Sequence, residues 1–554
     1  MAQLSRVSWF LLWLGLAVTA GWQGHLFGMP EGEAREWLIA WSGAFMGVAA
    51  MLVAVGVATH ARELADAVRA MGRPLRWSLA LLAVAGMLQA GAVAPRTHRI
   101  YYDETIYLAI GQNLAHLGRA QSCHSGGVEH GMLRCDQWEY NKQPNGFPFL
   151  VGLVYRLFGD SEEAVFYLNN GLMGLSVLVT ALLTRLIGWG WLAGGCAGLV
   201  FLWIPQNAHW FNTTAAEPSA ALFGALTVLV GLWYRRQGSV ATLTLLTALA
   251  AWAVQFRPES LLLLPLTLLI VWGGVVRTPR ILFLHLLLFW LLTLPVWLHL
   301  ELFRQHPWGS AGEPFALRYF FANLADNGLH YINNKEFPAA YALLALAGLL
   351  VPGAGRRERG VMGLWFLLFW GVFLFFYAGG YHYGADMRYS LLSHVPLAVL
   401  AGVGAAWLAD RIGGAVVVTL LVCLHLPFLP LVRATTSEAW AARADHRYAM
   451  RMAAALPPES LVLTHNPNMF QVWGVHAAQM SLAQASPEYV ERVLFPRYGG
   501  GVYLHYNFWC NIPDPGQNLF CRHALDRYDH EVVLEYREKE YRYALYRLQM
   551  KSAP

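Results

Sequence analysis

The chain has 554 residues, of which 56% are hydrophobic and only 13% charged, and its mean hydropathy is +0.39. This composition predicts a multi-pass membrane protein rather than a soluble one. The formal net charge of +5 does not indicate a nucleic-acid partner, because arginines in short loops between apolar runs are what orient membrane helices.

Long apolar runs predict about thirteen transmembrane helices. The runs lie at residues 8–28, 37–59, 77–95, 163–186, 189–205, 219–234, 240–255, 260–276, 281–300, 338–353, 361–378, 391–409 and 414–432. Several are short, so those helices would need a locally thinner bilayer or polar residues at one end. The first run lacks a strongly basic start and precedes further runs, so we do not interpret it as a cleaved signal.

Arginines mark every second loop between these runs if the N-terminus is cytoplasmic. They are Arg62, Arg69, Arg73, Arg76, Arg185, Arg235, Arg236, Arg277, Arg280, Arg356, Arg357, Arg359 and Arg411. Because basic loops stay in the cytoplasm, the other loops are expected outside. These are 96–162, 206–218, 301–337 and 379–390, together with the tail from residue 433.

The first outer loop contains two adjacent carboxylates, Asp103 and Glu104, at the start of a predicted amphipathic helix that stops at Gly118. We expect this helix on the membrane surface, where a carboxylate would act on a lipid-borne substrate. The simpler alternative is that Asp103 is a helix N-cap. Lys142 precedes a short apolar segment and would bind a lipid phosphate. The simpler alternative is that its side chain extends to the lipid headgroups without a specific role.

Four cysteines lie in segments assigned to the outside, as two close pairs. We expect disulfides between Cys123 and Cys135 and between Cys510 and Cys521, as suits an oxidising compartment. The alternative for the first pair is a metal site that adds His124 and His130. No metal is assigned, because these spacings match no strong zinc pattern.

The tail is polar and predicts a soluble α/β domain. The expected elements are a helix at 437–456, a strand at 460–465, a helix at 486–495, a strand at 501–506 and a hairpin at 531–547. Residues 499–501 are three glycines, which would form a turn before the strand or cradle a phosphate.

Several motifs resemble the GT-C glycosyltransferases, and most closely the protein O-mannosyltransferases and bacterial aminoarabinose transferases (glycosyltransferase family 39-like). The first-loop motifs are Tyr-Asp-Glu-Thr-Ile-Tyr at 102–107, Lys-Gln-Pro at 142–144 with Gly-Phe-Pro-Phe at 146–149, and Leu-Phe-Gly-Asp-Ser-Glu at 157–162. Later matches are Ala-Ala-Glu-Pro-Ser-Ala at 215–220, Phe-Arg-Pro-Glu-Ser-Leu at 256–261 and Met-Arg-Tyr-Ser-Leu-Leu at 387–392. The resemblance covers residues 77–432.

Three departures from this family pattern matter. Two predicted helices precede the usual first one, so residues 1–76 look like an addition. The phosphate-binding element of aminoarabinose transferases often reads Lys-Pro-Pro, whereas here it is Lys142-Gln-Pro. The chain contains no Trp-Trp-Asp sequence, which argues against an oligosaccharyltransferase that acts on asparagine.

The resemblance implies a mainly α fold, a multi-pass helical bundle of GT-C type. We expect two extra N-terminal helices in 1–76, a catalytic transmembrane domain in 77–432 with the large outer loop 96–162, and an extramembrane α/β domain in 433–554. The expected location is the bacterial inner membrane, with the N-terminus in the cytoplasm and the C-terminal domain in the periplasm or outside the cell.

The resemblance also implies an activity, in which a sugar moves from a polyprenyl-phosphate donor to a hydroxyl or amine outside the membrane, with inversion. Asp103 would be the base and Glu104 would orient the acceptor. Three cations, Lys142, Arg257 and Arg388, would neutralise the departing phosphate. Supporting or acceptor-contacting roles fall to Tyr102, Glu217, Glu259, Asp386 and Tyr389, although Glu217 and Asp386 would also serve as helix caps.

The expected partners, and simpler alternatives for some residues and for the function, are as follows. The acceptor would be an envelope lipid, glycan or protein, membrane lipids surround the chain, and no cofactor is expected, although a divalent metal is compatible. Simpler roles remain for Arg257, as an ion pair with Glu259, and for Arg388, as an interfacial anchor beside Tyr389. His209, His330 and His382 are interpreted as loop residues. The alternative functions are a polymerase or ligase that uses a diphosphate-linked oligosaccharide, and a lipid or solute transporter.

Overall fold

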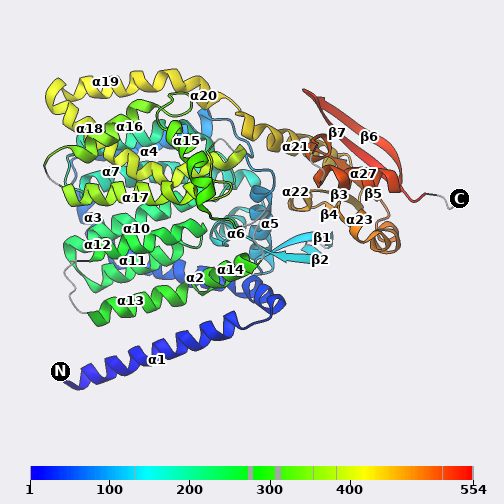
Figure 1. Cartoon of the computed structure of the whole chain (residues 1–554), viewed down its shortest axis with the longest axis horizontal. Helices are drawn as coiled ribbons and strands as arrows, with labels where there is room; N and C mark the ends of the chain where they lie inside the picture. Colours follow the sequence, from blue (N-terminus) through cyan, green and yellow to red (C-terminus); the bar gives the residue numbers. More distant parts are fainter. Residues whose placement is uncertain are drawn as a thin grey trace. The chain divides into compact units, whose positions relative to one another are not determined.

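The computed structural model describes residues 2–129, 132–272, 279–305, 313–353, 355–381, 384–513 and 516–551. The chain forms two compact units, each assembled from separate stretches of sequence (Figure 1). The first unit contains Met1–Arg96, Lys142–Phe147 and Glu163–Ala434. The second contains Thr97–Asn141, Pro148–Glu162 and Thr435–Pro554.

The first unit is helical. Its helices are α1 (Ala2–Phe27), α2 (Glu31–Thr59), α3 (Ala61–Ala70), α4 (Arg73–Leu88), η1 (Gln89–Val93), α7 (Glu162–Leu186), α8 (Trp191–Trp203), α9 (Pro205–Trp210), α10 (Glu217–Gln237), α11 (Val240–Ala253), η2 (Pro258–Leu262), α12 (Leu263–Val271), α13 (Pro279–Leu292), α14 (Leu294–Gln305), η3 (Leu317–Tyr319), α15 (Phe320–His330), α16 (Ala339–Leu350), α17 (Arg356–Leu374), η4 (Gly384–Ser390), α18 (Leu391–Ile412), α19 (Gly414–His425), η5 (Leu426–Phe428) and α20 (Leu429–Arg433). Each predicted apolar run falls on one or more of them.

Fewer single helices are long and apolar enough to span a membrane than the thirteen runs that were predicted to do so. Among the described residues, six helical stretches are long and apolar enough to cross a membrane, or seven if the bent pair α13–α14 counts as one span. The six are Glu31–Thr59, Arg73–Val93, Glu162–Leu186, Glu217–Gln237, Met387–Ile412 and Gly414–Arg433. Several of the other apolar runs form helices of 10–17 residues, too short to qualify alone. A multi-pass helical fold is therefore confirmed, but the count of about thirteen spans is not.

Helix α18 is largely buried in the helical unit and packs against α8, α16 and α17. Close approach depends on glycines at the crossings. A Cβ atom added at Gly348 of α16 would lie 1.9 Å from the Leu400 carbonyl oxygen, and one added at Gly404 would lie 2.1 Å from that of Leu344. On the other side, a Cβ at Gly402 would lie 2.5 Å from the Ala193 oxygen of α8.

The second unit is built on one seven-stranded sheet with the strand order β2-β1-β4-β3-β5-β7-β6. Its strands are β1 (Gln121–Glu129), β2 (Met132–Tyr140), β3 (Ser460–Thr464), β4 (His476–Gln479), β5 (Gly501–Tyr506), β6 (Asp529–Glu538) and β7 (Tyr541–Gln549). The central strand β3 is parallel to β4 and β5, and the other pairings are antiparallel. One sheet thus joins the first loop to the tail, because Ser125 of β1 pairs with Ala478 of β4.

The second unit also contains helices, several of which pack against this sheet. They are α5 (Asp103–His116), α6 (Gly146–Phe158), α21 (Ser437–Ala454), α22 (Pro467–Val472), α23 (Leu482–Ala485), α24 (Pro487–Tyr489), η6 (Val490–Leu494), α25 (Phe495–Arg497), α26 (Phe508–Asn511) and α27 (Gln517–Arg527). The expected tail elements are present, with the helix at 486–495 divided into α24, η6 and α25. The hairpin β1–β2 and strand β4 were not predicted.

Helix α5 is not the surface helix that we expected. It packs against β1 and α22, and most of its residues are buried. The sequence pattern was misleading because a helix that packs against protein on several sides also shows apolar residues at helical spacing.

Two disulfides stabilise the second unit. Cys123 is joined to Cys135 across the β1–β2 hairpin, and Cys510 is joined to Cys521 between α26 and α27. The alternative metal site is thereby disfavoured, since two of its four ligands are bonded to each other. Its fourth member, His130, lies outside the described residues.

Candidate active site

The two adjacent carboxylates have different environments. Asp103 is the first residue of α5 and is half-buried, and no side-chain cap is formed at this helix end. Glu104 is fully buried, and its Oε1 accepts hydrogen bonds from the backbone N–H groups of Arg99, at 2.6 Å, and Ile100, at 2.9 Å. Glu104 therefore holds the turn that leads into α5, whereas the carboxylate of Asp103 lies at the positive end of the helix dipole.

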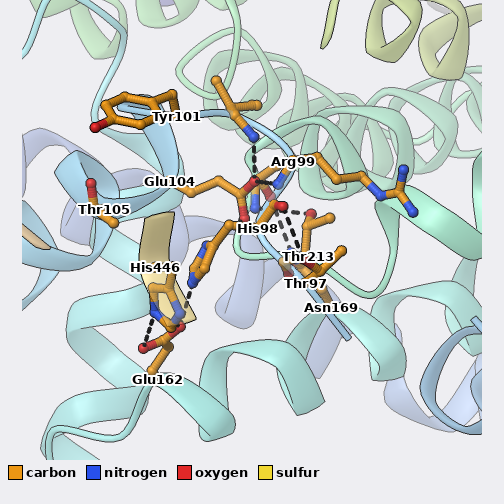
Figure 2. A network of polar contacts seen from close by, with 12 residues as sticks. Thr97, His98, Arg99, Tyr101, Glu104, Thr105, Glu162, Asn169, Thr213 and His446 are labelled. Atoms are coloured by element: carbon orange, nitrogen blue, oxygen red, sulfur yellow. Dashed lines mark hydrogen bonds and ion pairs between the residues drawn. The ribbon is translucent and has the colours of Figure 1, made fainter. Parts of the chain in front are cut away.

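His98 extends the Glu104 contacts into a network (Figure 2). Its Nδ1 is 2.9 Å from Glu104 Oε2, and its Nε2 is hydrogen bonded to Glu162 Oε1. The same Glu162 oxygen lies 3.1 Å from Nε2 of His446 in α21. Figure 2 shows both imidazole rings directed toward the Glu162 carboxylate.

The charges in this network support one another. Burial lowers the pKa of His98, but the carboxylates of Glu162 and Glu104 outweigh it and raise that pKa to about 10. Burial would raise the pKa of Glu104, yet His98 and the two backbone donors bring it below its ordinary value. Each charge in this network therefore stabilises the charge next to it.

Aromatic rings lie next to Asp103 in the chain. Tyr102 is stacked on Trp509 of α26, with ring centroids 6.1 Å apart, and Tyr101 meets the same Trp509 edge-on at 5.5 Å. Asn466 follows β3 and donates from its side-chain amide to the Tyr101 carbonyl oxygen at 3.0 Å. It also bonds the Thr105 hydroxyl at 2.9 Å. The carboxyl end of a central parallel strand thus supports the turn that carries Asp103.

A buried cation cluster forms in the first unit. Glu217, at the start of α10, has Oε1 2.8 Å from Nη1 of Arg257 and 3.4 Å from Nε of Arg388. The side chains of Glu217, Arg257 and Arg388 are 0%, 5% and 7% exposed. Arg257 precedes η2 and Arg388 lies in η4, so three separate segments deliver these charges to one point.

Two further predicted residues join this cluster. Glu259 accepts a hydrogen bond from Nε of Arg257 at 2.8 Å. The ring of Tyr389 lies 5.4 Å from the Arg257 guanidinium and 5.3 Å from that of Arg388, and it is stacked on Phe373. Glu217 is therefore an ion-pair partner of the arginines, and its side chain does not cap α10.

The segment that carries Lys142 is fixed next to the turn before Arg257. The N–H of Gly146 donates to the carbonyl oxygen of Gln255 at 2.7 Å. A Cβ atom at Gly146 would lie 2.5 Å from that oxygen, so only glycine fits. The ring of His299 in α14 is hydrogen bonded to the backbone of Lys142, whose own side chain is exposed.

The structure thus brings most of the predicted residues into two groups, one in each unit. Asp103, Glu104 and Tyr102 belong to the second unit, whereas Lys142, Glu217, Arg257, Glu259, Arg388 and Tyr389 belong to the first. The side chain of Asp386 and all of His382 lie outside the described residues. His209 bonds the Leu431 carbonyl oxygen at 3.1 Å, and His330 is buried among aromatic rings.

Sequence reasoning missed His98, Glu162, His446, Asn466 and Trp509. His98 and Glu162 stand inside or beside motifs that were noticed, but no spacing relates them to each other. His446 gives no local signal, because it lies in an ordinary polar helix and meets Glu162 from 284 residues away.

No protein-family model and no curated protein matches the chain. The solved structure of ArnT from Cupriavidus metallidurans in the apo state is similar to this chain with a TM-score of 0.52 and 14% identity, over 85% of this chain and 97% of that one.

Two other solved structures match less well. ArnT from Cupriavidus metallidurans bound to undecaprenyl phosphate has a TM-score of 0.49 at 14% identity, over 85% of this chain and 97% of that one. The oligosaccharyltransferase of Archaeoglobus fulgidus in the apo form has a TM-score of 0.46 at 12% identity, over 83% and 73%. ArnT is a GT-C fold glycosyltransferase, and the match to its apo structure along most of both chains shows that this chain has the GT-C fold.

Proposed function

We propose that this chain is a membrane glycosyltransferase that moves a sugar from a polyprenyl-phosphate donor to a hydroxyl or amine of an envelope lipid, glycan or protein. The observation that carries the proposal is the buried meeting of Arg257 and Arg388 on Glu217, with the Lys142 segment fixed beside the same turn. Cations assembled from separate segments suit a phosphate leaving group, on which negative charge develops.

The charges of this cluster suggest a different role for each of the three cations, Lys142, Arg257 and Arg388. The two guanidinium groups pair with the two carboxylates of Glu217 and Glu259, so the formal charges of these four groups sum to zero. Lys142 supplies the net positive charge. Arg388 presents the planar, two-pronged geometry that suits phosphate oxygens. Arg257, bound to two carboxylates, holds the cluster together and adds its charge to the field at the phosphate.

The reaction is a single displacement. The acceptor oxygen or nitrogen attacks the anomeric carbon of the sugar while the bond from that carbon to the phosphate oxygen breaks. The electron pair leaves with the polyprenyl phosphate, and the acceptor proton passes to Asp103 as the base. Attack opposite to the leaving group inverts the anomeric centre.

The environments of the two carboxylates favour different roles for them. Asp103 is half-buried at a helix start, as a base in contact with substrate requires. Glu104 is buried and bonded to the backbone of Arg99 and Ile100 and to His98, so we assign it the positioning of the Asp103 turn rather than contact with the acceptor. Tyr102 and Trp509 would offer aromatic faces to a sugar or an acceptor.

The alternating arginine loops support a location for this chemistry on the outer face of the bacterial inner membrane. In that orientation the N-terminus is cytoplasmic, and the tail lies in the periplasm or outside the cell. Residues 1–76 would be an addition to a catalytic domain at 77–432. The two cysteine pairs agree with an oxidising compartment for the first loop and the tail.

Purified full-length protein incubated with polyprenyl-phosphate sugars and extracted envelope lipids, glycans or proteins tests the proposal. The expected result is a glycosylated acceptor together with free polyprenyl phosphate. Release of polyprenyl diphosphate from a diphosphate-linked oligosaccharide would instead show a polymerase or ligase. Movement of a lipid or solute across proteoliposomes without any bond cleavage would show a transporter.

A further inference from the structure

Three side chains of the second unit converge on one point behind Glu104. His98 comes from the segment before α5, Glu162 from the start of α7 and His446 from α21 (Figure 2). One ligand atom from each, namely the Nε2 atoms of the two histidines and a Glu162 oxygen, lies within 4.8 Å of the others. The two imidazole rings are 4.4 Å apart between centroids.

Two imidazoles and one carboxylate are a ligand set for Zn²⁺ and similar divalent ions. Around a tetrahedral Zn²⁺ with bonds of about 2.0–2.1 Å, the ligand atoms are about 3.4 Å apart. His446 Nε2 is already 3.1 Å from Glu162 Oε1, so small side-chain rotations would admit an ion. A fourth coordination position would remain for water.

The surroundings of His98 match the support that metal-binding histidines usually have. Its second ring nitrogen, Nδ1, is 2.9 Å from Glu104 Oε2, and Glu104 is held in turn by backbone N–H groups. A carboxylate behind a histidine keeps Nδ1 protonated, directs Nε2 to the ion and makes the ring a stronger ligand. Glu104 is therefore the supporting carboxylate of this site, which accounts for its burial.

Access and burial also suit an ion. The side chain of His98 is 4% exposed, whereas Glu162 and His446 are 15% and 17% exposed, so the site opens to solvent on one side. The ring of Trp473 covers His446 from another direction, 5.1 Å away. Low exposure strengthens metal–ligand contacts, and the open side lets an ion enter.

We propose that His98, Glu162 and His446 bind a divalent transition-metal ion, Zn²⁺ by ligand type, with Glu104 as the supporting carboxylate. The ion joins the segment before α5, the start of α7 and the tail helix α21. It thereby holds the turn that carries Asp103 in a fixed position on the tail. The metal site stands whether or not the chain transfers sugars.

Metal content of the full-length protein in detergent tests this site without any activity measurement. The chain is stripped with a chelator, desalted, loaded with Zn²⁺ and analysed for bound metal, and affinity is measured by competition with a chromophoric chelator. We expect one Zn²⁺ per chain. Co²⁺ bound in its place should show the visible absorption of a site with nitrogen and oxygen ligands.

Variants identify the ligands. His446→Gln and Glu162→Gln should lose the bound ion, while their amides preserve most of the hydrogen bonding. Glu104→Gln should weaken binding about 10- to 100-fold, as for other supporting groups. His116→Gln is the matched control, because His116 also pairs with a carboxylate, Asp160, at 2.8 Å, but the described residues supply no third ligand there. It should bind Zn²⁺ like the unaltered protein.

Two results would overturn the metal site. One is failure of the unaltered protein to retain Zn²⁺ after desalting. The other is unchanged Zn²⁺ affinity in both His446→Gln and Glu162→Gln. Size-exclusion elution and thermal unfolding of each variant are measured in parallel, so that loss of the ion from a folded variant is distinguished from loss of the fold. If one variant does not fold, the other decides the result.

Discussion

At the scale of single residues, side chains of like charge have different environments and are assigned different roles. Asp103 and Glu104 are neighbours in sequence, yet one is half-buried at a helix start and the other is enclosed and bonded to the backbone. Likewise, Arg257 is paired with two carboxylates while Lys142 extends from an anchored segment with its side chain exposed. The environment of each group therefore decides which variants test catalysis, which test binding and which test stability.

Asp103→Asn should abolish transfer while the protein still inserts and folds. Loss of a general base lowers the rate by about 10²-fold or more. Turnover of the purified variant with saturating donor measures the effect. Asp160→Asn neutralises another carboxylate of the second unit, so it serves as the control and should retain activity. Near-normal turnover of Asp103→Asn would remove Asp103 from the role of base.

Lys142→Ala and Arg388→Ala should each weaken donor binding and leave acceptor affinity largely unchanged. Loss of a charge-assisted contact worth about 1.5–3 kcal/mol raises the donor Kd about 10- to 100-fold. Lys142→Arg should be milder because the charge remains, whereas Arg388→Lys loses the two-pronged geometry.

Donor affinity in nanodiscs decides the roles of these two cations. Lys335→Ala removes an exposed lysine of another outer loop in the first unit and should have no effect. Unchanged donor binding in both alanine variants would show that Lys142 and Arg388 are interfacial anchors, and the phosphate contact would have to be sought at Arg257.

Glu217→Gln should destabilise the helical unit. The substitution removes the buried charge that Arg257 and Arg388 share, so two guanidinium groups are left facing each other. Breaking a buried ion pair on one side costs about 3–5 kcal/mol. The midpoint of thermal unfolding in detergent should fall clearly below that of Glu259→Gln, which removes a less buried carboxylate of the same cluster. Equal midpoints would contradict the central role of Glu217.

At the scale of elements, α21 is fixed to the outer hairpin of the sheet by one carboxylate. Glu538, at the end of β6, accepts hydrogen bonds from Arg443 at 2.6 Å and from the Tyr448 hydroxyl at 3.0 Å, and it also pairs with Arg447. These partners all lie on one face of α21. The same helix carries His446, so the position of the proposed metal ligand depends on this contact.

The Glu538 contact should make the tail less stable in acid. Burial alone would raise the pKa of Glu538, but Arg443, Tyr448 and Arg447 lower it below its ordinary value. The unfolded state therefore binds the proton more readily, and the stabilisation is present above about pH 4.3 and lost as the pH falls through the lowered pKa.

Glu538→Gln should remove this pH dependence. At pH 7 the variant should be less stable by about 1 kcal/mol, and the difference from the unaltered protein should shrink as the pH falls below about 4.3. Urea-dependent proteolysis of the tail at several pH values measures it. Glu531→Gln, a change at an exposed position of β6 in the same hairpin, should leave stability nearly unchanged. A constant difference between Glu538→Gln and the unaltered protein across this pH range would contradict the assignment.

At the scale of the whole molecule, the chain passes repeatedly between its two units. It leaves the helical unit after Arg96, returns for Lys142–Phe147, leaves again and returns at Glu163. Within the helical unit, Arg96 lies 3.6 Å from Glu163 and over the ring of Tyr167, so the first exit and the last return of the loop are held together. The segment between these two points carries both Asp103 and Lys142, so its two ends are fixed within the helical unit.

Membrane orientation is tested by single cysteines in a chain whose free Cys196 and Cys423 have been replaced. Cysteines at exposed positions of the outer loops and tail, Leu117, Leu317 and Arg492, should react with an impermeant reagent in intact cells. Cysteines at Ala70 and Gly360 should react only after permeabilisation, because arginine-rich loops remain in the cytoplasm. Reaction of the tail only after permeabilisation would reverse the proposed orientation.

The sequence by itself determined the features that depend on neighbouring residues. Apolar runs were sufficient to predict the helices, because each run by itself must be kept out of water. Strand-like apolar segments were sufficient for β3 and β5, and alternation of side chains was sufficient for the β6–β7 hairpin. Composition with short motifs was sufficient for the GT-C fold. Cysteine spacing also indicated the two pairs that the structure joins.

The tertiary structure alone decided which distant groups meet. Ser125 and Ala478 pair in one sheet, Arg257 and Arg388 share Glu217, and Glu162 lies between two histidines. Nothing in a local window encodes such meetings, since they follow from how whole helices and strands pack. Glu104 shows the difference most clearly. Its sequence position suggested catalysis, whereas its burial and its hydrogen bonds to His98, Arg99 and Ile100 favour the supporting role that we propose for it.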